Sequence, residues 1–213
     1  MDSIPASAER LSTGFSKVSN GQISEAWQRA RNAFLAAGTP LLGVPRVSDY
    51  PELLASADWI FAGVPSTRGS VGPSGCALAP KSLRDFSRNF ALFFEPEELT
   101  TYGWYDYMTQ EWSARGARLM DAGDMILAHG QSNVQHFSSI ERGFQRLRAS
   151  APESRILALG GDHAITLPLI AGLYESHDES DLTVLHIDAH QDALQANVER
   201  RYAELNAANV MAF

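Results

Sequence analysis

The chain has 213 residues, of which 45% are apolar and 20% are charged, as in an ordinary packed globular protein. Its formal net charge of −8 argues against a nucleic-acid partner, which would need a basic face. Because Cys76 is the single cysteine, and no signal-type or membrane-spanning apolar segment is present, we expect a cytoplasmic protein with no membrane partner.

The first part of the chain predicts an arm, a helix and a loop. Residues 1–22 are polar and small, so we expect a flexible arm ahead of a single α/β domain over residues 23–213. Apolar side chains at helical spacing predict a helix over 24–37, with Phe34 on its buried face. Three prolines then predict an extended surface loop over 39–56.

The middle of the chain predicts two strands separated by a helix. Residues 59–64 form a continuous apolar run, which is typical of a strand covered on both faces. A loop rich in glycine, serine and proline follows, and Pro80 suits the first turn of a helix. The apolar stripe expected on that helix consists of Leu83, Phe86 and Phe90. A short strand, or the loop that belongs to it, is expected near 119–124.

Strands and helices then alternate. Ser132 and Gln135 form a capping box for a helix whose apolar side chains recur as far as Leu147. Strands are expected at 155–159 and 183–187, with a helix beginning at Thr166 between them. This alternation predicts an α/β fold with parallel strands, in which ligands bind beyond the carboxyl ends of the strands.

Two motifs lie at such strand ends. Asp188, His190 and Asp192 follow the strand expected at 183–187, and alternation along an extended backbone would point all three the same way. Gly-Gly-Asp-His at 160–163 follows the strand before it. Carboxylates with an imidazole suit a divalent ion such as manganese, so we expect both motifs to supply one metal site.

Four side chains make up the expected site. We assign His163 and Asp192 to one ion and His190 to a second ion, with Asp188 shared between the two. Two ions about 3.5–4 Å apart would lower the pKa of a bridging water and give hydroxide at neutral pH. Asp162 would orient a ligand, and His186, deeper in the strand, is expected in a hydrogen-bonded core or supporting role.

Other interpretations stay open at this point. Residues 160–163 could form only a strand-to-helix turn, with Asp162 capping the helix. Asp-x-His also begins metallophosphoesterase sites, but these need Gly-Asp and Asn-His elements, which do not follow Asp192. A deacetylase on a related fold fits the motif order less well. A non-catalytic binding or assembly protein could also keep part of such a site.

The two motifs resemble the ureohydrolase superfamily of arginases, agmatinases and related hydrolases, whose motifs are Gly-Gly-Asp-His and Asp-Ala-His-x-Asp. Weaker likenesses, at 38–45, 62–72 and 121–124, keep the same order. The resemblance implies a three-layer α/β/α fold with a mostly parallel sheet, two Mn²⁺ ions and a homo-oligomer. It also implies hydrolysis of a small guanidino substrate to urea and an amine. The implied metal ligands are His163, Asp188, His190 and Asp192, with Asp188 and His190 at the catalytic hydroxide.

Two departures from the family pattern qualify this expectation. The family adds a later Asp-x-Asp motif, which is not found before Phe213, so we expect a fragment that lacks the last strands of the sheet. The alternative is a degenerate, non-catalytic relative that acts as a metal-binding or assembly protein. The Arg-Pro-Gly usual in the first loop is replaced at 72–75, and Ala207-Ala208 stands in the place of a His-Gly pair. The substrate pocket is therefore expected to differ.

Overall fold

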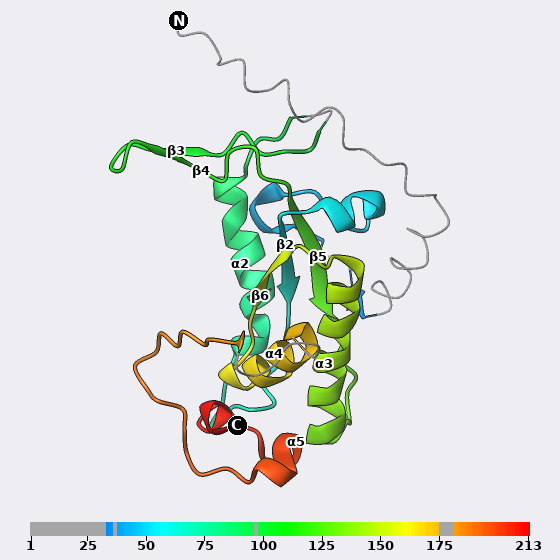
Figure 1. The fold of residues 1–213 in the computed structure, drawn as a ribbon, viewed down its shortest axis with the longest axis vertical. Helices are drawn as coiled ribbons and strands as arrows, with labels where there is room; N and C mark the ends of the chain where they lie inside the picture. Colours follow the sequence, from blue (N-terminus) through cyan, green and yellow to red (C-terminus); the bar gives the residue numbers. More distant parts are fainter. Residues whose placement is uncertain (1–32, 36–37, 96–97, 175–180) are drawn as a thin grey trace, which may run out of the picture.

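A computed structural model describes residues 33–35, 38–95, 98–174 and 181–213 (Figure 1). The arm predicted over 1–22 and most of the helix predicted over 24–37 lie outside the described residues. The prediction is wrong at the end of that helix, because Phe34–Leu35 forms a short strand, β1. Pairing with the edge of the main sheet satisfies its backbone, and the Phe34 ring still packs edge-on against Phe144, 6.3 Å away.

Three parallel strands form the centre of the sheet, as predicted. They are β2 (Trp59–Gly63), β5 (Leu119–Met125) and β6 (Arg155–Leu159). The strand order is β1-β5-β2-β6, with β1 antiparallel to β5. Since Gly63 pairs with both Leu159 and Asp124, the carboxyl ends of all three parallel strands meet at one edge.

Helices cover both faces of this sheet, so the predicted three-layer α/β/α arrangement is confirmed (Figure 1). On one face, α3 (Asn133–Ser150) and α4 (Thr166–Tyr174) share a core with Ile60 and Ala62 of β2. On the other face, α2 (Ala79–Ser87) contacts β5 through Arg84. Strand alternation explains the division, because neighbouring residues of a strand point to opposite faces.

The remaining elements are short. The main sheet is accompanied by a two-stranded hairpin of β3 (Trp104–Asp106) and β4 (Glu111–Ser113), which projects from the molecule (Figure 1). The other segments are η2 (Leu41–Gly43), η3 (Pro51–Ser56), η4 (Cys76–Leu78), η5 (Arg88–Phe90), η6 (His163–Ile165), η8 (Val198–Arg200), α5 (Arg201–Glu204) and η9 (Val210–Ala212). None of the helices in the described part of the chain has both the length and the apolarity to cross a membrane.

The capping box predicted for α3 is present in full. The Ser132 hydroxyl accepts the N–H of Gln135, and the Gln135 side chain accepts the N–H of Ser132. This arrangement satisfies backbone donors that the first turn of a helix leaves free. The predicted apolar face is also confirmed, since these side chains are buried: Phe137, Ile140, Phe144 and Leu147.

A glycine of α4 allows the close packing of α4 on α3. A Cβ atom at Gly172 would lie 2.4 Å from the Glu141 carbonyl oxygen and 2.9 Å from the Phe144 Cβ. We therefore expect Gly172→Ala to lower the free energy of unfolding by about 1–3 kcal/mol, as overpacking does. Gly75→Ala, where nothing lies within 4 Å, is the matched control for urea denaturation. A stabilised Gly172→Ala protein would contradict this packing.

The apolar stripe predicted for α2 does not face the sheet. Leu83 is 46% exposed and Phe86 is 64% exposed, whereas Arg84 is only 2% exposed. The reason is Asp121, a fully buried carboxylate on β5 that needs a cationic partner. The helix therefore turns Arg84 toward the sheet and leaves Leu83 and Phe86 on its outer side.

The strand predicted at 183–187 is wrong, because these residues have no regular secondary structure. Leu185 is 84% exposed and Ile187 is 88% exposed. A continuous apolar strand needs cover on both faces, and no described element covers the side toward which these two residues point. The segment is not paired with β6, which is the last strand in the order of the main sheet.

Candidate metal centre

The Gly-Gly-Asp-His turn lies directly on the chain that leaves β2. Gly161 donates its N–H to the Val64 carbonyl, and Asp162 donates its N–H to the Ser66 carbonyl, at 3.2 and 3.0 Å. A Cβ at Gly161 would lie 2.6 Å from the Ser66 oxygen, closer than side chains approach backbone. A glycine is therefore required, and the turn places His163 at the carboxyl edge of the sheet.

Asp162 holds this turn from inside. Its carboxylate accepts the N–H groups of Gly69 and Ala164, at 2.9 and 3.0 Å, and the Ser70 hydroxyl at 3.3 Å. Burial raises the pKa of Asp162, and these hydrogen bonds oppose that rise. The carboxylate thus caps η6 and ties the loop after β2 to the turn.

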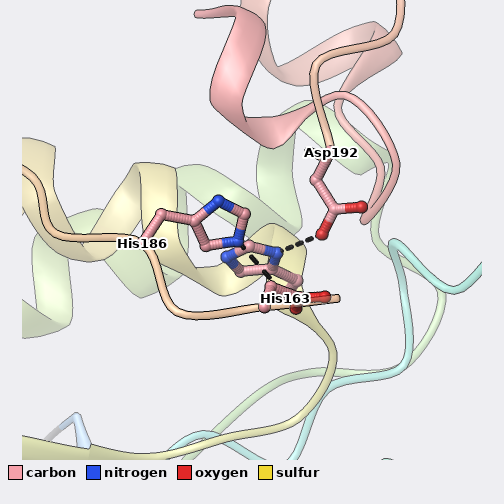
Figure 2. Close-up of side chains that lie close together, drawn as sticks. His163, His186 and Asp192 are labelled. Carbon is pink, nitrogen blue, oxygen red and sulfur yellow. Dashed lines mark hydrogen bonds and ion pairs between the residues drawn. The ribbon is translucent and has the colours of Figure 1, made fainter. Parts of the chain in front are cut away.

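Four ligand-type side chains converge beside this turn, and Figure 2 shows three of them, His163, His186 and Asp192. His163 Nδ1 lies 2.5 Å from Asp192 Oδ2, and the His163 and His186 rings stack with centroids 4.9 Å apart. With Asp188 they form a group whose donor atoms all lie within 4.8 Å of one another. The structure therefore brings together three of the four residues expected from the sequence, from two turns 25 positions or more apart.

His186 is the site residue that the sequence analysis placed elsewhere. Its Nε2 atom is buried, has no hydrogen-bond partner among the residues that the structure describes, and lies 3.9 Å from Asp188 Oδ2. A buried imidazole nitrogen without a partner is costly unless something else binds it. Its signal was present in the sequence, since His186 shares the strand parity of Asp188.

His190 does not join the group, contrary to the alternation expected along residues 188–192. Its side chain is 82% exposed. The Asp188 carboxylate accepts the N–H of His190 at 2.9 Å, which bends the chain, and Asp192 has a positive φ of 46°. Alternation holds only for extended backbone, so it ends at Asp188. His190 Nδ1 nevertheless stays 3.4 Å from Asp188 Oδ1.

The electrostatics favour an ionised Asp188. The pKa of Asp188 is lowered, chiefly by the hydrogen bond from the N–H of His190. Burial is the second-largest effect and opposes this, and the neighbouring rings of His186, His190 and His163 each lower the pKa by a smaller amount. Its side chain is 35% exposed, whereas that of Asp192 is 16% exposed. The arrangement is an anionic group with two imidazoles, open to solvent at Asp188, which can hold a divalent cation.

The comparisons with known proteins agree on one family. The model of the Arginase family matches residues 57–212. An agmatinase of Blochmanniella floridana is 33% identical over 141 residues, covering 66% of this chain and 41% of that protein. An agmatinase of Sodalis glossinidius is 29% identical over 162 residues, covering 76% and 45%. The chain thus spans less than half the length of these two relatives.

Solved structures agree on the fold. A hypothetical agmatinase from Burkholderia thailandensis superposes with a TM-score of 0.64 at 21% identity, covering 83% of this chain and 49% of that chain. Arginase from Medicago truncatula superposes with a TM-score of 0.55 at 22% identity, covering 91% and 54%.

Proposed function

The chain belongs to the arginase family, and on that premise we propose that it carries the metal centre of an amidinohydrolase. The reaction is hydrolysis of the guanidinium group of a small guanidino compound, similar to agmatine or a guanidino acid, to urea and an amine. The observation that carries this proposal is the approach of His163 to Asp192 and Asp188 beside a buried, unpartnered His186 nitrogen. Relatives that are named agmatinase support the substrate class.

The donor chemistry of the group fits manganese. Carboxylate oxygens and imidazole nitrogens suit a divalent ion of intermediate hardness, and the free Nε2 of His186 offers a donor that the protein leaves unused. His163, His186, Asp188 and Asp192 would hold one ion. A second ion would be held by Asp188, as a shared ligand, together with His190.

Different residues of the chain have different roles in the proposed reaction. A bound metal ion supplies a Lewis acid that lowers the pKa of water. Asp188 and His190 are the proposed catalytic residues, since both reach solvent at the open side of the group. Asp162 keeps the turn of His163 in place from behind.

Metal content and urea release of the native protein test the proposal. We expect manganese to co-purify, and urea to appear from at least one guanidino compound only when manganese is bound. Chelation should stop urea release, and added manganese should restore it. Absence of manganese-dependent urea from every guanidino compound offered would count against hydrolysis.

The two histidines at 186 and 190 give a sharper test. We expect His186→Ala to weaken manganese binding by more than the 10–100-fold typical of groups behind the ligands, because its Nε2 would itself bind the ion. His190→Ala should leave the first, tighter binding step within about threefold of the native protein, because its ring lies outside the group. Isothermal titration with manganese measures both. A stronger effect of His190 on the tighter step would mean that the ion lies on the other side of Asp188.

A non-catalytic, metal-binding role is the second candidate, favoured by the exposed position of His190. In that case titration would give one manganese per chain, and no guanidino compound would release urea. We further propose a cytoplasmic homo-oligomer; the single Cys76 supports the compartment, and membership of the family supports the assembly.

A further inference from the structure

A buried serine–histidine pair lies behind the metal centre and has no part in the proposed reaction. The Ser66 hydroxyl is 2.8 Å from His136 Nε2. Ser66, just after β2, is 2% exposed, and His136, in the first turn of α3, is 8% exposed. The His136 ring also packs edge-on against Phe137, with centroids 5.4 Å apart. The pair therefore joins the loop after β2 to the start of α3.

The hydrogen-bond roles in this pair follow from its surroundings. Burial, and secondly the charge of Arg68, lower the pKa of His136, which favours the neutral ring, and a neutral ring can accept a hydrogen bond at Nε2. The Ser66 oxygen already accepts the N–H of Arg68 at 3.2 Å. Its O–H is thus available to donate to His136, and both buried groups are satisfied.

The backbone of Ser66 supports the turn that carries His163. Its carbonyl accepts the Asp162 N–H at 3.0 Å and touches Gly161, where no side chain would fit. Three residues later, Gly69 donates its N–H to the Asp162 carboxylate at 2.9 Å. The loop over 66–70 therefore bonds to the turn at two points, the backbone N–H and the carboxylate of Asp162. The hydrogen bond between Ser66 and His136 holds the loop itself in position.

From this chain of contacts we propose that His136, acting through Ser66, is a positioning residue for the metal centre. It holds the loop over 66–70 against the Gly-Gly-Asp-His turn and so sets where His163 points. This positioning role rests on the proposed function in one respect only, the measurement of manganese affinity. Its structural content, protection of the turn, is independent of any metal.

Two variants remove the pair and one keeps it. His136→Phe retains a ring but no acceptor, and Ser66→Ala removes the hydroxyl. His136→Gln is the conservative variant, because its amide reaches about as far as Nε2 and can still bond to a hydroxyl. The matched control is Ser154→Ala. That hydroxyl is about as buried as the Ser66 hydroxyl, and it donates to the Ala57 carbonyl near the amino ends of the strands, away from the turn.

Hydrogen exchange of the metal-free protein gives the first readout. We expect the Gly161 and Asp162 amides to exchange at least tenfold faster in His136→Phe and in Ser66→Ala than in the native protein. The variant that combines both changes should exchange at the same rate as either single variant. His136→Gln and Ser154→Ala should leave these two amides protected. Unchanged exchange in both disrupting variants would overturn the positioning role.

Manganese affinity gives the second readout. We expect a 10–100-fold loss in His136→Phe and Ser66→Ala, the range found when groups behind metal ligands are removed, with recovery in His136→Gln. Faster exchange with unchanged affinity would overturn the link to the metal centre. If the native protein itself bound no manganese, the proposed function would fail, while the exchange result would still decide whether His136 holds the turn.

Discussion

Replacing Asp121 with alanine is expected to lower the free energy of unfolding by about 3–5 kcal/mol, the cost of breaking a buried ion pair. Arg84 Nε and Nη2 each bond to an Asp121 oxygen, at 2.8 and 2.9 Å, and the two side chains are 3% and 0% exposed. Asp121 also accepts the N–H groups of Leu41 and Gly123, at 2.7 and 2.8 Å. The substitution would leave a buried guanidinium with Asp124 as its remaining carboxylate partner.

An exposed ion pair on the same helix provides the control. Asp85 pairs with Lys81 on the outer side of α2, where both side chains reach solvent, so Asp85→Ala should cost less than about 0.5 kcal/mol. Urea denaturation measures both variants. The joint replacement Arg84→Met with Asp121→Leu should recover part of the loss, since the guanidinium is then no longer buried without Asp121. A cost below about 1 kcal/mol for Asp121→Ala would show that this pair does not hold α2 on the sheet.

Replacing His163 or Asp188 with alanine is expected to abolish retention of manganese. Each contributes a donor atom to the group at the edge of the sheet, so the loss should exceed the 10–100-fold typical of groups behind the ligands. Both side chains are partly exposed, at 24% and 35%, so the metal-free variants should unfold within about 1 kcal/mol of the native protein. Urea release, where present, should fall with the metal.

Metal analysis after gel filtration, with urea denaturation alongside, separates the site from the fold. His129→Ala is the control, because His129 is exposed and lies outside the group. Manganese content that is unchanged in both the His163 and the Asp188 variants would show that the site has been misplaced.

The parts of the fold that carry local signals could be predicted from the sequence. The strands at 59–64 and 155–159 are apolar runs between turn residues, and each forms where expected. The helix that begins after Ser132 combines a capping box with an apolar stripe of helical period, so its start and its buried face are both correct. The structure of such segments can be predicted from their own residues alone.

Other features depend on partners distant in the chain. The side of α2 that faces the sheet is chosen by Asp121, 37 residues beyond Arg84, and no pattern within the helix reveals it. Residues 183–187 have the composition of a strand but lack cover on one side among the described elements. Composition thus predicts what a segment could be, and its neighbours decide what it is.

Only part of the candidate site could be predicted, because the rest depends on contacts that local sequence does not show. Alternation along a strand predicts from neighbouring residues alone which way Asp188 points, and the same alternation points His186 that way too. The exposed position of His190 depends on a bend made by the Asp188 carboxylate and on the positive φ of Asp192. A short polar side chain that bonds to the backbone two residues on competes with extended structure, and periodicity alone does not show this.

The convergence of two turns on one cation is tested most directly by diffraction from crystals of the native protein grown with manganese, recorded at the manganese absorption edge. We expect an anomalous peak within bonding distance of the imidazole of His163 and the carboxylates of Asp188 and Asp192, on the side of His186. A peak at another place in the molecule, or fully loaded crystals without a peak between His163 and Asp192, would contradict the proposed centre.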